Sequence, residues 1–344
     1  MYEIEQLSQA MIREAIESQA SDLHLIPTNK DYVIQMRIHG QISRRKRLKY
    51  QQAERLISHL KYQSGMDIGE RRKAQSSTIY FYENEIAYFL RLSTLPAVPS
   101  ESLAIRISEQ HSHKNLHALP LLNKQTNHLL SLLRFTYGLI LLTGPTGSGK
   151  TTTLYALLKE WLKIGGKRII SIEDPVEQNL EEVVQIQINE KAGITFDSGL
   201  KSILRHDPDI IVIGEIRDRL TAELALRMAL TGHLVIATLH THNSYSAIFR
   251  LLDFGLTKEE LGEALRVILS QRLLLPTCSL CQIHLYSTDC THYLERKRKA
   301  IFEFLKGEEL KAALLNRPFH YRKISSELRL AWALGLIEHT ELEG

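Results

Sequence analysis

Hydrophobic and polar positions in the first hundred residues predict a small mixed domain. Apolar residues recur every three to four positions between residues 3 and 19, which predicts an amphipathic helix, and a second helix is expected near residues 51–64. Alternation of apolar and polar residues predicts strands at residues 22–26, 32–38, 78–82 and 86–93. This order indicates an α+β domain, and three prolines with a polar cluster between residue 94 and about residue 120 predict a connection to a second domain.

The middle of the chain has a different pattern. Apolar runs with almost no charge, at residues 139–142, 168–172, 210–213 and 234–238, alternate with helical segments. Strands that are buried on both faces have this composition, so the runs predict a parallel sheet with helices on both sides. Beyond residue 275 the pattern becomes irregular and then helical again, and residues 324–337 predict a short helical tail.

The first of these apolar runs leads into a glycine-rich segment, residues 144–151, which we call the phosphate loop. Its glycines let successive backbone N–H groups, together with the N-terminus of the following helix, face a phosphate. In such a loop Lys150 is expected to reach the β- and γ-phosphates, and the hydroxyl of Thr151 is expected to hold Mg²⁺. The predicted nucleotide-binding residues are Gly144, Pro145, Thr146, Gly147, Ser148, Gly149, Lys150, Thr151 and Thr152.

Length and composition limit the class of protein. The 344 residues suit two domains, and 44% hydrophobic and 24% charged residues are ordinary for a globular protein. The net charge of +4 is too small to argue for nucleic acid. No apolar run approaches the roughly 20 residues that cross a bilayer, and the N-terminus lacks the layout of a secretion signal. With three cysteines gathered in one segment, these features predict a protein of the reducing cytoplasm.

Acidic residues follow two of the apolar strands, at the edge where an open α/β sheet places its ligands. Glu173 follows residues 168–172 and is a candidate for orienting the attacking water or the metal. A turn at Asp174 and Pro175 is the structural alternative. Glu215 comes after the run at residues 210–213 and is our leading candidate for polarising water or supporting Mg²⁺, with packing of a strand end as the alternative.

Two histidines, His233 and His240, flank the last of the four strands. A lone histidine is more often structural than catalytic, and His242 is expected in a solvated loop. The strand between His233 and His240 should neighbour the strand that leads into the phosphate loop. We therefore predict that these two histidines sense the γ-phosphate.

In this order and spacing the motifs resemble those of one family, the secretion or traffic ATPases of type II secretion systems, type IV pili and competence pseudopili. The resemblance extends from Ala-Ser-Asp-Leu-His-Leu at residues 20–25 to Ala-Trp-Ala-Leu-Gly-Leu-Ile at residues 331–337. It implies an α/β fold, in which a smaller α+β domain precedes a P-loop, RecA-like parallel-sheet ATPase domain with a short helical C-terminal tail. We place the N-terminal domain at residues 1–107, a linker at 108–120, the ATPase core at 121–275 and the C-terminal segment at 276–344.

The resemblance also implies partners and cofactors. The resemblance implies a ring hexamer that uses ATP and Mg²⁺. It also implies that the ring acts on an inner-membrane platform protein and, through that protein, on pilin-like subunits. Arginines of the N-terminal domain neutralise charge that develops on the transferred phosphate. By position the candidates are Arg37, Arg91 and Arg106, each of which is otherwise an exposed strand residue.

Two departures from the family pattern favour one branch. A large N-terminal docking domain is expected to be absent, because the chain begins almost at the Ser-Asp-Leu-His segment. In place of two Cys-x-x-Cys pairs the chain has only Cys278, Cys281 and Cys290, with His284 and His292 nearby, so bound Zn²⁺ is not expected. A short ATPase with an eroded zinc loop resembles the competence ATPases of Gram-positive bacteria. The expected function is to power assembly of the DNA-uptake pseudopilus at the inner face of the cell membrane.

Other functions fit parts of the sequence. A type II secretion ATPase or a pilus retraction ATPase would carry the same motifs. A DNA-translocating motor is indicated by the basic runs at residues 44–47 and 296–299, but neither run contains an aromatic residue for base stacking, so solvated faces are favoured and no direct nucleic-acid binding is expected. A nucleotide-binding scaffold is a third class, against which the filled catalytic positions argue.

Overall fold

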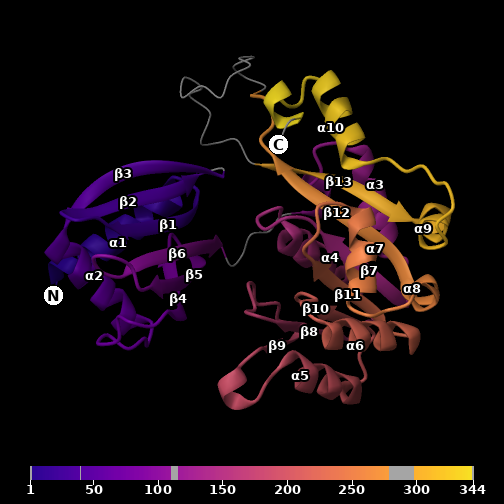
Figure 1. The fold of residues 1–344 in the computed structure, drawn as a ribbon, viewed down its shortest axis with the longest axis horizontal. Helices are drawn as coiled ribbons and strands as arrows, with labels where there is room; N and C mark the ends of the chain where they lie inside the picture. The colour runs from indigo at the N-terminus through magenta and orange to yellow at the C-terminus, as the bar shows by residue number, and fades with distance from the viewer. Residues whose placement is uncertain (1, 39, 110–114, 279–297, 343–344) are drawn as a thin grey trace. The chain divides into compact units, whose positions relative to one another are not determined.

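The computed structural model describes residues 2–38, 40–109, 115–278 and 298–342 of the 344-residue chain. The chain divides into two compact units, Met1–Ser112 and His113–Gly344 (Figure 1). Among the described residues, one unit contains a six-stranded sheet and the other a seven-stranded sheet. The finer division of the chain into linker, core and C-terminal segment stays a prediction.

The first unit is an antiparallel sheet with two helices packed against it. The strand order is β3-β2-β1-β6-β5-β4, and each neighbouring pair is antiparallel. Alternate residues of β2 are buried, including Ile34 and Met36, and Met11 and Leu56 of the two helices are also fully buried. In chain order the elements are α1 (Tyr2–Glu17), β1 (Ala20–Pro27), β2 (Asp31–Ile38), β3 (Gln41–Lys49), α2 (Tyr50–Gln63), β4 (Gln75–Glu83), β5 (Ile86–Leu95) and β6 (Ser102–Glu109).

Both predicted helices and the four predicted strands of this unit are present, so the α+β prediction is confirmed. Two strands were missed. Strand β3 lies at an edge of the sheet. It carries a run of basic residues and lacks the apolar alternation from which a strand is predicted. Strand β6 pairs with both β1 and β5, so the predicted start of the connection at residue 94 is wrong.

The second unit has a mostly parallel sheet in the order β13-β12-β7-β11-β10-β8-β9, and of its described strand pairs only β12–β13 is antiparallel. Short 3₁₀ turns occur at Leu116–Ala118, Glu190–Ala192, Leu204–His206 and His339–Leu342. The helices and strands are α3 (Lys124–Leu132), β7 (Gly138–Thr143), α4 (Lys150–Ile164), β8 (Ile169–Glu173), β9 (Val184–Gln187), α5 (Phe196–Ile203), β10 (Ile210–Ile213), α6 (Arg219–Leu230), β11 (Leu234–Leu239), α7 (Ser244–Asp253), α8 (Lys258–Ala264), β12 (Leu265–Leu274), β13 (Lys299–Lys306), α9 (Gly307–Leu314) and α10 (Ile324–Ala333).

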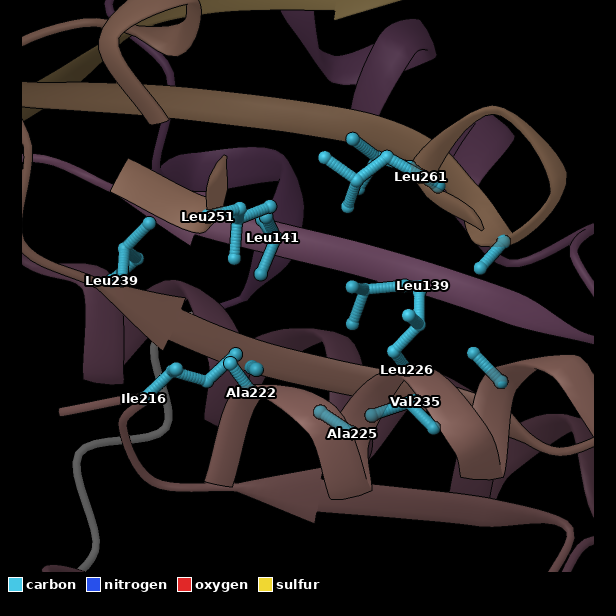
Figure 2. Packing of buried hydrophobic residues seen from close by; sticks show 14 of the residues in the cluster. Leu139, Leu141, Ile216, Ala222, Ala225, Leu226, Val235, Leu239, Leu251 and Leu261 are labelled. Atoms are coloured by element: carbon cyan, nitrogen blue, oxygen red, sulfur yellow. The ribbon is translucent and has the colours of Figure 1, made fainter. Parts of the chain in front are cut away.

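Strand β7 shows how this sheet is buried on both faces. Leu139 and Leu141 belong to one apolar cluster, with α5 to α9, and Figure 2 shows both leucines beside residues of α6 and α7. The residues between them and beyond, Ile140 and Leu142, belong to a second cluster with α3 and α4. All four side chains are at most 1% exposed, and burial of each contributes about 1.5–3 kcal/mol to folding.

The predicted α/β fold class is confirmed, with a parallel sheet between two layers of helices and a C-terminal helix α10. Strands β9, β12 and β13 were not predicted. The segment of β12 mixes apolar residues with Arg266, Gln271 and Arg272, which hides a strand that is largely buried. In the described ranges, no helix combines the length and the apolar composition that crossing a membrane requires.

Candidate nucleotide-binding site

Four neighbouring strands of the second unit bring the predicted site residues to one edge of the sheet. Strands β7, β11, β10 and β8 lie next to one another and run parallel, so their carboxyl ends meet at the same edge. The phosphate loop follows β7 and His240 follows β11. Glu215 follows β10 after Gly214, and Glu173 is the last residue of β8. The register therefore places the loop, one histidine and two acids side by side.

The backbone of the phosphate loop has the form that an anion-binding turn requires. Gly144 and Gly149 have φ angles of 142° and 86°, a region that side chains disfavour. The loop opens into the N-terminus of α4, where the first helical N–H groups have no partner within the helix. The Ser148 hydroxyl is buried and has no hydrogen-bond partner within the described residues. The loop thus fits a ligand rich in acceptor oxygens, such as a nucleotide phosphate.

Lys150 supplies the positive charge of the loop. Its side chain is only 7% exposed, and its Nζ donates hydrogen bonds to the carbonyl oxygens of Gly144 at 2.8 Å and Pro145 at 3.1 Å. Burial lowers the pKa of Lys150 to about 8, and the nearby Glu177 carboxylate only partly offsets that shift. A phosphate would give the ammonium group a charged partner in place of two neutral carbonyl groups.

Glu215 lies in a chain of charged and polar groups. Its Oε2 is 3.2 Å from His240 Nε2, and its Oε1 pairs with the guanidinium of Arg217. The same guanidinium donates to Asp174 Oδ2 at 3.1 Å. Burial lowers the pKa of His240, with Lys150 and Arg217 adding to that effect, so the imidazole is neutral at pH 7. In the tautomer with the proton on Nε2, the neutral imidazole donates a hydrogen bond to the Glu215 carboxylate.

Glu173 is held in a buried network of hydrogen bonds. Its side chain accepts from Tyr155 Oη at 2.7 Å and from Ser171 Oγ at 2.6 Å, with Gln185 Nε2 at 3.4 Å. Burial raises the pKa of Glu173, while these three donors lower it. Tyr155 belongs to α4, the helix that begins in the phosphate loop, so the loop and Glu173 are connected through one helix. Glu173 as an acid or metal-supporting group stays a prediction.

The two predicted histidines lie at opposite ends of β11. His240 follows the strand, beside Glu215, whereas His233 precedes it. The His233 carbonyl accepts from the N–H of Gly138, at the start of β7, and its Nδ1 is 3.1 Å from the Met228 carbonyl oxygen. Six strand residues span roughly 20 Å, so within this chain His233 is too far from the phosphate loop to sense a phosphate there. Phosphate sensing by His233 stays a prediction.

Thr151 and Thr152 lie in the first turn of α4 and are half-buried. Of the other loop residues, Pro145, Thr146 and Gly147 are exposed. A hydroxyl at the start of α4, next to Lys150, is where a phosphate-bound metal ion would find a ligand.

The three predicted arginines of the first unit form one row across its sheet. Arg37 and Arg106 are both directly opposite Asp22, and Arg91 is directly opposite Arg106. Directly opposite residues point to the same face, so Arg37, Arg91 and Arg106, the arginine row, share a face with one carboxylate. Asp22 is 3.0 Å from Arg106 Nε and 3.9 Å from Arg37 Nε. Three positive charges with one counter-charge make a surface suited to a polyanion.

Several residues of these networks escaped the sequence analysis. Tyr155 is hidden within the apolar pattern of α4, and Asp22 becomes significant only through strand register. Arg217 follows Glu215 by two residues, and this spacing in the sequence could have indicated that the two side chains interact. Most of the proposed zinc-loop residues, Cys281, His284, Cys290 and His292, lie outside the described residues, and Cys278 is buried. The expectation about zinc stays a prediction.

Comparison with known proteins gives consistent relatives. Residues 2–338 match the family described as Type II/IV secretion system protein. Competence protein ComGA of Halalkalibacterium halodurans is 45% identical over 342 residues, which cover 99% of this chain and 98% of that protein. Competence protein ComGA of Bacillus subtilis is 41% identical, with 98% and 96% covered. A crystal structure of the pilus retraction motor PilT with bound ADP is 27% identical, with a TM-score of 0.70 and coverage of 97% of this chain and 95% of that one.

Proposed function

Since this chain belongs to the Type II/IV secretion system protein family, we propose that it is the motor that powers assembly of a competence pseudopilus for DNA uptake. The observation that carries the proposal is the match to two ComGA competence proteins over nearly their whole length and nearly the whole of this chain. The proposal includes a ring of six copies at the inner face of the cell membrane, acting through a platform protein on pilin-like subunits.

The chain is an ATPase, and we assign the steps of nucleotide binding and hydrolysis to its own residues. The phosphate loop and Lys150 bind the β- and γ-phosphates, and Thr151 with Glu173 or Glu215 would hold Mg²⁺, which neutralises phosphate charge when bound. Glu215 is placed by Arg217 and His240 to accept a proton from the attacking water. The arginine row of the first unit is proposed to stabilise charge on the transferred phosphate.

Pilus retraction is a second candidate, favoured by the similarity to the retraction motor PilT. The ComGA relatives have a higher identity, 41–45% against 27%, so assembly is preferred. The two directions make opposite predictions about the filament. Loss of an assembly motor abolishes pseudopili, whereas loss of a retraction motor leaves them in place or lengthens them.

The test replaces Glu215 by Gln in the source organism and in purified protein. We expect ADP binding to be retained, ATP turnover to fall by about 10²–10⁴-fold, and both pseudopili and transformation to be lost. The control is Glu223→Gln, which removes a half-buried carboxylate that pairs with Arg219 on α6, outside the site. Unchanged turnover and DNA uptake in the Glu215 variant would refute the motor, and retained or longer pseudopili would favour retraction.

A further inference from the structure

Strand β12 runs alongside the phosphate loop as well as alongside β7. Ser270 of β12 is paired with Thr143, the last residue of β7, and β12 then continues to Leu274. Gln271 is the first residue of β12 beyond that pair, so it lies level with Gly144, where the loop begins. The end of β12 therefore lies directly beside the phosphate loop.

Gln271 touches the loop near both of its ends. A Cβ atom added to Gly144 would lie 2.5 Å from the backbone oxygen of Gln271, and one added to Gly149 would lie 2.8 Å from its Nε2. At Gly144 the obstacle is a backbone atom, so no side chain fits there, whereas at Gly149 the side-chain amide of Gln271 would have to move. The two glycines are thus needed not only for their backbone angles but also because Gln271 occupies the space beside them.

The side chain of Gln271 also binds the helix that follows the loop. Its Oε1 accepts a hydrogen bond from Thr153 Oγ1 at 2.8 Å. Gln271 is 2% exposed and Thr153 is 0% exposed, so water cannot replace either partner. Gln271 consequently contacts the start of the loop, its end and the first turn of α4 at once.

Ordinary core packing is the alternative explanation of a buried glutamine, and the chain contains a residue for comparison. Gln125 is also 2% exposed, and its amide exchanges two hydrogen bonds with the backbone of Phe302, at 2.7 and 3.1 Å. Those contacts link α3 to β13 and include no residue of the phosphate loop. Loss of hydrogen bonding at Gln125 therefore measures the cost to the fold alone.

We propose that Gln271 is a positioning residue for nucleotide binding. It fixes the separation between Gly144 and Gly149, so that the loop N–H groups and Lys150 are aligned before the phosphates arrive. Such preorganisation lowers the ordering cost of binding and acts on substrate and product alike. This inference rests on the proposed ATPase function and deepens it by assigning a determinant of nucleotide affinity on a strand outside the loop.

The experiment compares Gln271→Met with Gln125→Met in the full-length protein. Both changes keep the side-chain volume and remove the amide. Affinity for ADP is measured by calorimetry, KM and kcat by steady-state ATP hydrolysis, and Tm by circular dichroism. For Gln271→Met we expect Kd for ADP and KM to rise about tenfold with kcat changed less than about threefold, and for Gln125→Met a lower Tm with an unchanged Kd.

A second pair keeps the proposal testable if Gln271→Met does not fold. Thr153→Val loses the hydrogen bond to Gln271 and Thr153→Ser keeps the hydroxyl, so only the valine variant should raise Kd, by about threefold or more. Equal ADP affinities in both glutamine variants, or in both threonine variants, would overturn the positioning role. Wild-type protein that binds no ADP would instead overturn the proposed function.

Discussion

We expect Lys150 to make nucleotide affinity depend on pH. Its pKa is about 8 because the amine is buried, and phosphate oxygens would favour the charged form again. Below pH 8 both free and bound protein carry the proton, so affinity should be constant there. Above pH 8 the free protein loses the proton while the complex keeps it, so Kd should rise tenfold for each pH unit. At pH 9.5, where about one free amine in 30 is charged, Kd for ADP should be about 30-fold weaker than at pH 7.

Calorimetry of ADP binding at several pH values between 7 and 9.5 tests this. Titrations in two buffers of different ionisation enthalpy count the protons taken up on binding, which should approach one at the alkaline end. The control is Lys150→Arg, whose guanidinium stays charged throughout, so its affinity should be weaker but flat with pH. A flat wild-type curve, or an equal slope in the arginine variant, would show that Lys150 is not the titrating group.

Three further predictions concern the same networks. Gly144→Ala should weaken ADP binding about tenfold more than Gly147→Ala. A Cβ atom added to Gly144 would lie 2.5 Å from the backbone oxygen of Gln271, whereas one added to Gly147 would meet nothing within 4 Å. Fluorescence titration compares the two variants, and equal losses of affinity would refute the close contact. Tyr155→Phe removes a donor that holds down the pKa of Glu173, so the acidic limb of the kcat–pH profile should move to higher pH. An unmoved limb would argue that Glu173 does not titrate in catalysis. Arg106→Gln should lower kcat about 10²-fold and change Kd for ADP less than threefold, and a loss confined to Kd would contradict a role in the transition state.

The sheet of the second unit was predictable where a strand is an uninterrupted apolar run. Strand β7 reads as an uninterrupted apolar run because each side of it meets a helical layer. Strand β13 escaped prediction because Glu303, a buried carboxylate held by the N–H groups of Ser244 and Ile324, interrupts its apolar residues. The pattern of apolar residues does not reveal a single buried polar group whose hydrogen-bond partners lie on other elements.

The same limit applies to the candidate site. Lys150 and Glu215 could be predicted because they lie within short motifs that follow strands. Asp22 and Gln271 could not, because their significance depends on which strand pairs with which, and in what register. The separation of His233 from His240 was missed for a related reason: a position before a parallel strand and a position after it lie at opposite edges of the sheet.

Helix α4 joins the phosphate loop to the buried acid. Lys150 is its first residue, and Tyr155, five residues along or about 7.5 Å up the axis, holds Glu173. We expect a shift of its first turn on phosphate binding or release to be passed along the helix to the Tyr155 hydroxyl. On that expectation, departure of the product and realignment of Glu173 are coupled through one helix.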